Sequence, residues 1–214
     1  ILCSPISYYD RQVGGPCNVM SAIDSITLAG KLQLQEEDSN TWLVDPGSNP
    51  DPFNPWYTTE WDTMQCLRRN FGNVLSHNLA IWWMDLWADG RFNADSVWAN
   101  NAKLIEAYTD SMNAQTAALP QVALIYDEES LLALKSDSYN LTRHNAYEQR
   151  SVFQRSGLQV GYYQIEDLPN LPASVRLIVF VTAFRMDAAE RTLVEAAKRD
   201  GRTLLWLYAP GYAA

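Results

Sequence analysis

Three adjacent acids, Glu36, Glu37 and Asp38, come at the end of a short strand-like run that starts at Lys31. Acids at the carboxyl end of a barrel strand lie where such folds carry out their chemistry. Carboxylates that crowd together also repel, and the resulting pKa shifts suit a nucleophile or a proton carrier. A solvated acidic turn is the alternative, and a charge cluster taken alone favours it. Whether these acids form a catalytic site or a surface turn therefore depends on the residues that surround them.

A second apolar run from Ala80 ends in Trp82, Trp83 and Asp85. Aromatic faces stack on sugar rings by apolar contact, and seven of the eight tryptophans lie in the first hundred residues. Large aromatics also fill cores, so a core role for both tryptophans stays open. Side chains alternate along a strand, so only one of the pair should face a site, where Asp85 could bind a sugar hydroxyl.

Tyr8 and Arg11 lie on the loop that follows the first strand-like run. A guanidinium there could donate hydrogen bonds to a sugar or steady the charge of a carboxylate nucleophile. A surface salt bridge is the equally weighted alternative for Arg11. The residue types alone therefore leave a carbohydrate site and a structural role open as alternatives.

The elements that position these residues follow an α/β rhythm. A helix after Pro16 is expected to reach Leu28, where Gly30 stops it. Thr59 and Asp62 form an approximate capping box for a second helix. The expected elements of this first region are strands at 1–4, 31–35 and 80–84, the last of them buried, loops at 39–57 and 85–92, and helices at 16–28, from 58 or 59 onward, and at 94–118.

A second region starts at Leu119-Pro120 and carries four further strand patterns. Asp187 and Glu190 form a capping box that opens its last helix. Strands that alternate with helices predict a small, doubly wound parallel sheet. The expected strands are 122–126, 158–163, 175–181 and 203–208, and the expected helices are 128–134, 140–156 and 187–199.

Composition excludes several classes of function. The chain has 25 acids against 16 bases, a formal charge of -9, which argues against a nucleic-acid partner. No run approaches the roughly 18 apolar residues of a membrane span. Three cysteines without a CxxC pair and two histidines imply no metal and no cofactor. The chain starts at Ile1 without a signal-peptide pattern, so we expect a trimmed or partial chain that is soluble, with the cytoplasm favoured.

Four segments occur in the order seen in a known family. They are Ser4–Arg11 followed by Gly14-Gly15, Gly30–Asp38 with Thr41, Leu67–Phe71, and Trp82–Leu86. Each resembles a segment of the β-galactosidase-like glycoside hydrolases of family 42 and their relatives. Residues 119–214 resemble the next domain of those enzymes, a trimerisation domain with a flavodoxin-like, class I glutamine-amidotransferase-like fold.

The resemblance implies that residues 1–118 are the C-terminal portion of a (β/α)8-barrel and that 119–214 are an incomplete flavodoxin-like trimerisation domain. It implies a retaining hydrolase of β-galactosides or related sugars, with Glu36 as the nucleophile and Glu37 as the runner-up. The strand with the acid/base is missing, so we expect the 214 residues alone to be inactive or nearly so. The residues expected to bind the substrate are Tyr8, Arg11, Glu37, Asp38, Trp82, Trp83 and Asp85.

Whether this chain acts as an enzyme is left open by the sequence. Residues 119–214 contain no cysteine, so glutaminase chemistry is not expected there. A non-catalytic carbohydrate-binding or oligomerisation module is the alternative to a hydrolase fragment. A third possibility is self-assembly of partial barrels into a homo-oligomer, because a few strands cannot close a barrel and leave exposed edges.

Overall fold

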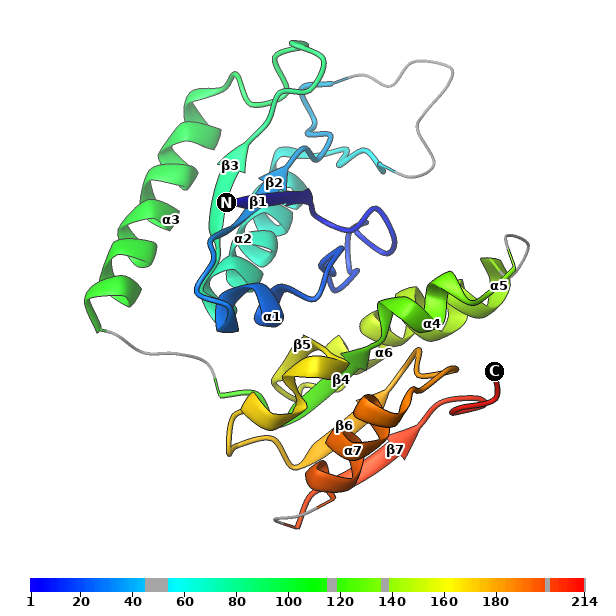
Figure 1. Ribbon diagram of the computed structural model, residues 1–214. Helices are drawn as coiled ribbons and strands as arrows, with labels where there is room; N and C mark the ends of the chain where they lie inside the picture. The colour runs from blue at the N-terminus through cyan, green and yellow to red at the C-terminus, as the bar shows by residue number, and fades with distance from the viewer. Residues whose placement is uncertain (45–53, 115–118, 136–138, 199–200, 214) are drawn as a thin grey trace. The chain divides into compact units, whose positions relative to one another are not determined.

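The chain is an α/β protein with two compact units, each built on a parallel sheet (Figure 1). The structure, a computed structural model, describes residues 1–44, 54–114, 119–135, 139–198 and 201–213. The first unit consists of residues 1–20 and 31–118, and the second of residues 21–30 and 119–214. Residues 21–30, which the sequence analysis placed with the first region, therefore pack with the second unit.

The first unit carries a three-stranded sheet in the order β1-β2-β3. Its strands are β1 (Leu2–Pro5), β2 (Gln33–Glu37) and β3 (Ala80–Trp83), and both pairs are parallel. Helix α2 (Glu60–Ser76) contacts both β3 and α3 (Asp95–Ala114). The hydroxyl of Thr59 accepts a hydrogen bond of 3.0 Å from the backbone N–H of Asp62, so the expected cap of α2 is confirmed.

The second unit carries a four-stranded parallel sheet in the order β5-β4-β6-β7. Its strands are β4 (Val122–Tyr126), β5 (Val160–Gln164), β6 (Leu177–Phe180) and β7 (Thr203–Trp206). The helices are α4 (Glu128–Leu132), α5 (Tyr139–Thr142), the π-helical turn η1 (Arg143–Glu148), α6 (Gln149–Gln154), the 3-10 helix η2 (Ile165–Asn170) and α7 (Ala188–Ala197). The capping box of Asp187 and Glu190 is present at the start of α7. One face of the sheet, with Ile125, Ile178 and Phe180, forms a core with η2 and α7.

Helix α1 (Ile23–Leu28) covers the free edge of β5 in the second unit. The Asp24 carboxylate accepts a hydrogen bond of 2.7 Å from the backbone N–H of Tyr162. The Ser25 hydroxyl accepts one of 2.7 Å from the backbone N–H of Gln164. Edge strands present unpaired N–H groups that other chains can pair with, so these two side chains protect the edge.

The helix expected over 16–28 is shorter than the pattern predicts. Only Ile23–Leu28 is helical, because Cys17 has a φ of 58° and cannot continue an α-helix. The carbonyl of Asn18 accepts a hydrogen bond of 2.8 Å from the backbone N–H of Ser7 instead. Val19 and Ile23 are buried all the same, so their apolar spacing reflects core packing rather than one continuous helix.

The strand boundaries also differ from the prediction in ways that affect the site. Strand β2 extends through Glu37, so Glu36 and Glu37 belong to the strand itself. Strand β3 is not the buried strand expected at 80–84, because it lies at the edge of its sheet and Trp82 is exposed. Three of the expected elements lie partly outside the described residues. These are the loop at 39–57 (residues 45–53), the helix at 94–118 (residues 115–118) and the end of the last helix (residue 199). No helix in the described ranges is long and apolar enough to cross a membrane.

Candidate functional site

The two glutamates of β2 lie on opposite faces of the first sheet, because successive strand side chains alternate. Glu37 is buried on the face that meets α2. Its Oε2 accepts a hydrogen bond of 2.6 Å from Asn70 Nδ2, and its Oε1 accepts one of 3.1 Å from the backbone N–H of Ser39. Burial raises the pKa of Glu37, although these hydrogen bonds and the charge of Arg11 oppose the shift. Glu37 is thus fixed within the protein.

Glu36 projects from the other face of the sheet and is half-buried. In the strand register it lies between Pro5 of β1 and Trp82 of β3, so these three residues share one face. No group in the described part of the chain forms a hydrogen bond or ion pair with its carboxylate. Burial and the nearby charge of Asp38 raise the pKa of Glu36, while Arg11 opposes this. Of the two glutamates, Glu36 alone has a carboxylate free for chemistry.

Asp38, just past β2, is fully buried and held by two side chains of the β1 loop. Its Oδ1 accepts a hydrogen bond of 2.8 Å from Arg11 Nη1, and its Oδ2 accepts one of 2.5 Å from the hydroxyl of Tyr8. The Arg11 guanidinium lies 4.1 Å from the centre of the Tyr8 ring. Burial, with the hydrogen bond to Asp38, raises the pKa of Tyr8 to about 12. The surface salt bridge considered for Arg11 is wrong, because the ion pair has no exposure to solvent.

The backbone at Asp38 is held as firmly as its side chain. Its carbonyl accepts hydrogen bonds of 2.8 Å from Arg91 Nη1 and 3.0 Å from Asn54 Nδ2. Asn54 Oδ1 in turn accepts a hydrogen bond of 2.9 Å from Arg11 Nη1. Arg91 is buried and donates to both carboxylate oxygens of Asp89, at 3.0 and 2.7 Å, and these bonds lower the pKa of Asp89. Two buried arginines therefore fix the end of the strand that carries Glu36.

Asp85, which was expected to bind a sugar hydroxyl, organises the loop after β3. Its carboxylate accepts hydrogen bonds of 3.0 Å and 2.9 Å from the backbone N–H groups of Asp89 and Gly90. It also lies 3.5 Å from Arg91 Nε. These contacts tie the β3 loop to the same arginine that holds the end of β2.

The two tryptophans of β3 alternate as the strand pattern requires. Trp83 packs against a cluster of Met64, Leu67, Phe92 and Val97 on the helix side. Trp82 is 39% exposed and leaves the sheet on the face of Glu36. The interpretation that both tryptophans are core residues is therefore wrong for Trp82.

Of the four acids Glu36, Glu37, Asp38 and Asp85, only Glu36 has a carboxylate that accepts no hydrogen bond within the described part of the chain. Glu37, Asp38 and Asp85 all accept hydrogen bonds from the protein, whereas Glu36 lies beside an exposed aromatic ring. A half-buried carboxylate with nearby cationic and aromatic groups can act as a nucleophile or as an acceptor for a ligand hydroxyl. The described residues contain no group of His, Cys, Asp and Glu side chains arranged to hold a metal ion.

Sequence reasoning missed three residues that build the site: Asn54, Asn70 and Arg91. Arg91 lies 53 positions after Asp38, and no local pattern pairs the two. Asn70 is a polar residue on the buried stripe of α2. Its pairing with Glu37 could be predicted only if it were already known which side chains of β2 face the helix.

The fold and the site define an α/β protein with two parallel sheets, one of which gathers acids at its carboxyl end. No protein-family model matches the chain, and no curated protein matches it. Among solved structures, part of the chain is similar to the crystal structure of beta-galactosidase from Bifidobacterium adolescentis, with 20% sequence identity and a TM-score of 0.37. The match covers 44% of this chain and 43% of that chain, so this chain spans less than half the length of that structure.

Proposed function

We propose that this chain is part of a retaining glycoside hydrolase for β-galactosides or related sugars, and that Glu36 is its nucleophile. The observation that carries the proposal is the contrast between the glutamates of β2: Glu37 is buried and bound by Asn70, while Glu36 has a free carboxylate beside the exposed ring of Trp82. The order of motifs that resemble the family 42 β-galactosidases supports the same assignment.

In a retaining hydrolase, one carboxylate attacks the anomeric carbon and forms a glycosyl-enzyme, while a second group, about 5–5.5 Å away, protonates the leaving oxygen and then activates water. Glu36 fits the first role, because an unpaired carboxylate is available to attack. Glu37, Asp38 and Asp85 do not fit the second role, because their oxygens accept hydrogen bonds from the protein. The acid/base is therefore proposed to come from barrel strands outside this sequence.

The other expected site residues divide into two roles. Trp82 is proposed to stack under a sugar ring, because its indole is exposed on the face of Glu36. Tyr8, Arg11 and Asp38 are proposed to position the strand end rather than to contact the sugar, because the ion pair is buried and its oxygens are occupied. The packing of Trp83 and the burial of Glu37 favour structural roles for both.

Each of the two sheets is proposed to have a different role, one in catalysis and the other in assembly. The three parallel strands are proposed to be part of a (β/α)8-barrel, whose further strands would cover the exposed face and edges of the sheet. The four-stranded parallel sheet is proposed to be a flavodoxin-like assembly domain, with other copies of the same protein as partners. A carbohydrate would then be the substrate and a homo-oligomer the working form.

Hydrolysis of a chromogenic β-galactoside by the full-length gene product tests the proposal. Glu36→Gln should lower kcat by at least about a thousandfold without changing the unfolding temperature, because it removes the nucleophile only. Glu37→Gln is the matched control. Its kcat per folded molecule should stay close to that of the wild type. The isolated 214-residue chain should hydrolyse the substrate at the background rate, and activity that Glu36→Gln abolishes in it would overturn the claim of inactivity.

A non-catalytic carbohydrate-binding module is the second candidate, favoured by the exposed Trp82 and by the lack of a second available acid among the described residues near Glu36. Calorimetry of the 214-residue chain with a panel of sugars tests it. Binding heat that is lost in Trp82→Ala but kept in Trp61→Ala, an exposed tryptophan of α2, would favour this candidate. Absence of heat with every sugar would count against it.

A further inference from the structure

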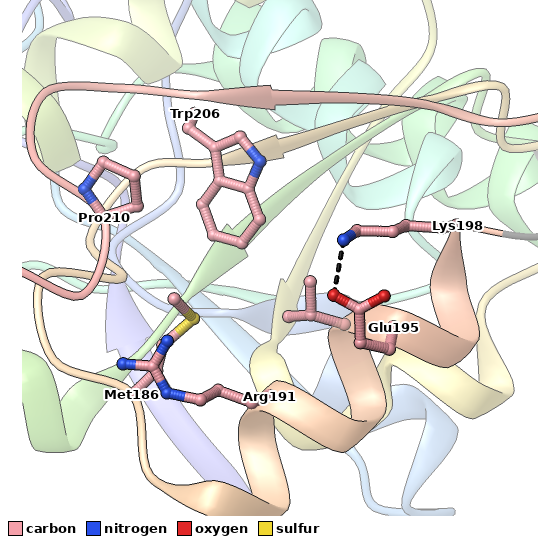
Figure 2. A pocket seen from close by; sticks show the side chains of 7 residues that line it. Met186, Arg191, Glu195, Lys198, Trp206 and Pro210 are labelled. Carbon is pink, nitrogen blue, oxygen red and sulfur yellow. Dashed lines mark hydrogen bonds and ion pairs between the residues drawn. The ribbon is translucent and has the colours of Figure 1, made fainter.

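The second unit contains a pocket of about 220 Å³ between α7 and β7 (Figure 2). It is lined by Met186, Arg191, Val194, Glu195, Lys198, Trp206 and Pro210. Arg191, Val194 and Glu195 come from one face of α7, and Lys198 is the residue that caps its C-terminus. The volume is below that of most drug-sized pockets, about 300–1,000 Å³, and suits a molecule with one ring.

An indole ring forms an apolar wall of this pocket. Trp206 is the last residue of β7, and one face of its ring stacks on Phe180 with 3.8 Å between ring centres and 8° between planes. The stacked face is part of the core, which leaves the other face available to a ligand. Met186, Val194 and Pro210 add further apolar surface. The walls therefore favour a flat or ring-shaped molecule.

The charged groups of the pocket leave one cation unpaired. Lys198 donates to the carboxylate of Glu195, so these two charges offset each other. No carboxylate or carbonyl in the described ranges accepts a hydrogen bond from the guanidinium of Arg191. Figure 2 shows Arg191 beside Met186, at the opposite end of the pocket from the Lys198–Glu195 pair. The pocket therefore carries a net positive charge at the Arg191 end.

The loop after β7 passes close to Arg191. A methyl group built on Gly211 would lie 3.1 Å from Arg191 Nη2 and 3.4 Å from Met186 Cε. Gly211 has a φ of 63° and no side chain, so the loop can pass close to both groups. The guanidinium thus lies close to this loop, although Arg191 as a whole is exposed to solvent.

We propose that this pocket binds a small carboxylate that carries one ring, with the ring against Trp206 and the carboxylate on Arg191. A guanidinium pairs with a carboxylate through two parallel hydrogen bonds, which suits a single arginine. Such a ligand could be an aromatic acid or a sugar acid, because both present an apolar ring face and one carboxylate. The site lies in the second unit and does not depend on Glu36 or on hydrolysis.

Titration of the protein followed by ¹H–¹⁵N NMR tests this site, with the indole N–H signal of Trp206 as the readout. Sodium benzoate and sodium galacturonate are the two carboxylate probes, and benzamide and galactose are their uncharged counterparts. We expect at least one carboxylate to shift the Trp206 signal with a Kd of about 1 mM, in line with the size of the probe. Its uncharged counterpart should bind several-fold more weakly, and the better carboxylate identifies the ring class.

Arg191→Gln should weaken carboxylate binding by about tenfold, because it removes the charged hydrogen bonds. Arg185→Gln is the matched control: Arg185 is an exposed arginine of the same unit that does not line the pocket, and its loss should leave Kd unchanged. If Arg191→Gln alters signals throughout the spectrum, Arg191→Lys is used as the test variant instead. It keeps the charge and should bind the carboxylate with an affinity between those of the wild type and Arg191→Gln. A Trp206 signal that does not respond to either carboxylate, or a Kd that is the same in the Arg191 variant, would overturn the proposal.

Discussion

Arg11 and Asp38 form an ion pair with 2.8 Å between Nη1 and Oδ1, and neither side chain is exposed to solvent. The pair joins the loop after β1 to the end of β2, and it places a fixed cation and a fixed anion near Glu36. Arg11 also donates hydrogen bonds to the backbone carbonyls of Ile6 and Ser7. The position of the candidate nucleophile thus depends on contacts between segments that are distant in the sequence.

Arg11→Met should lower the free energy of unfolding of the first unit by about 3–5 kcal/mol, because it leaves the buried Asp38 carboxylate without its cationic partner, with only the hydrogen bond from Tyr8. Urea unfolding followed by tryptophan fluorescence measures this, since seven of the eight tryptophans lie in the first hundred residues. Arg11→Lys retains the charge and should cost less. A loss below about 1 kcal/mol for Arg11→Met, the size of an exposed pair, would contradict the buried ion pair.

Glu37 should make stability depend on pH in the direction opposite to that of acids whose pKa is lowered by ion pairs or hydrogen bonds. Burial raises its pKa above the ordinary value of 4.5, so the folded state takes up a proton first as the pH falls. The cost of burying the charge is present at neutral pH and is relieved as the pH falls through the raised pKa.

The free energy of unfolding of the wild type, relative to Glu37→Gln, should therefore rise between neutral pH and about pH 5. Urea unfolding curves of the two proteins across this range measure the difference. Glu60→Gln, at an exposed acid of the first turn of α2, controls for the loss of one negative charge. A difference that stays constant or falls with decreasing pH would show that Glu37 is not buried as described.

The cover that α1 provides for β5 can be tested at single amides. Asp24→Ala should expose the backbone N–H of Tyr162, and Ser25→Ala that of Gln164, because each loses its acceptor. Each lost hydrogen bond should reduce stability by about 0.5–1.5 kcal/mol. Native-state hydrogen exchange reads the two amides separately.

Thr27→Ala is the control for these two variants, because its hydroxyl donates to the carbonyl of Ile23 within α1 and does not reach β5. It should leave both amides protected. Tyr162 and Gln164 amides that exchange at the wild-type rate in both Asp24→Ala and Ser25→Ala would contradict the edge contact. Their exchange would then have to be limited by other parts of the second unit.

The sequence predicted secondary-structure elements correctly where neighbouring residues in the sequence determine them. The caps at Thr59 and Asp187 depend on residues three positions apart, and both are present in the structure. The strand expected at 122–126 is present as β4, a central strand of the parallel sheet. The helix expected from Pro16 is interrupted at Cys17, which has a positive φ and whose carbonyl accepts a hydrogen bond from Asn73, a residue distant in the sequence.

The candidate site was only partly predictable, because most of the contacts that build it join residues distant in the sequence. Strand alternation separated Glu36 from Glu37, and the structure places them on opposite faces of β2. The partners that hold the strand end are non-local: Arg91 and Asn54 reach the carbonyl of Asp38 from later loops. The assignment of α1 to the second unit likewise depends on contacts with β5, which lies more than a hundred residues further along the chain.

The central claim is that Glu36 is the nucleophile, and covalent trapping tests it most directly. A 2-deoxy-2-fluoro-β-galactosyl fluoride forms a stable glycosyl-enzyme with a retaining hydrolase and needs no acid catalyst for its leaving group. Peptide mass mapping of the treated full-length gene product should find one fluorogalactosyl group on Glu36 and none in Glu36→Gln. A label on any other residue, or an active protein that acquires no label, would contradict the account.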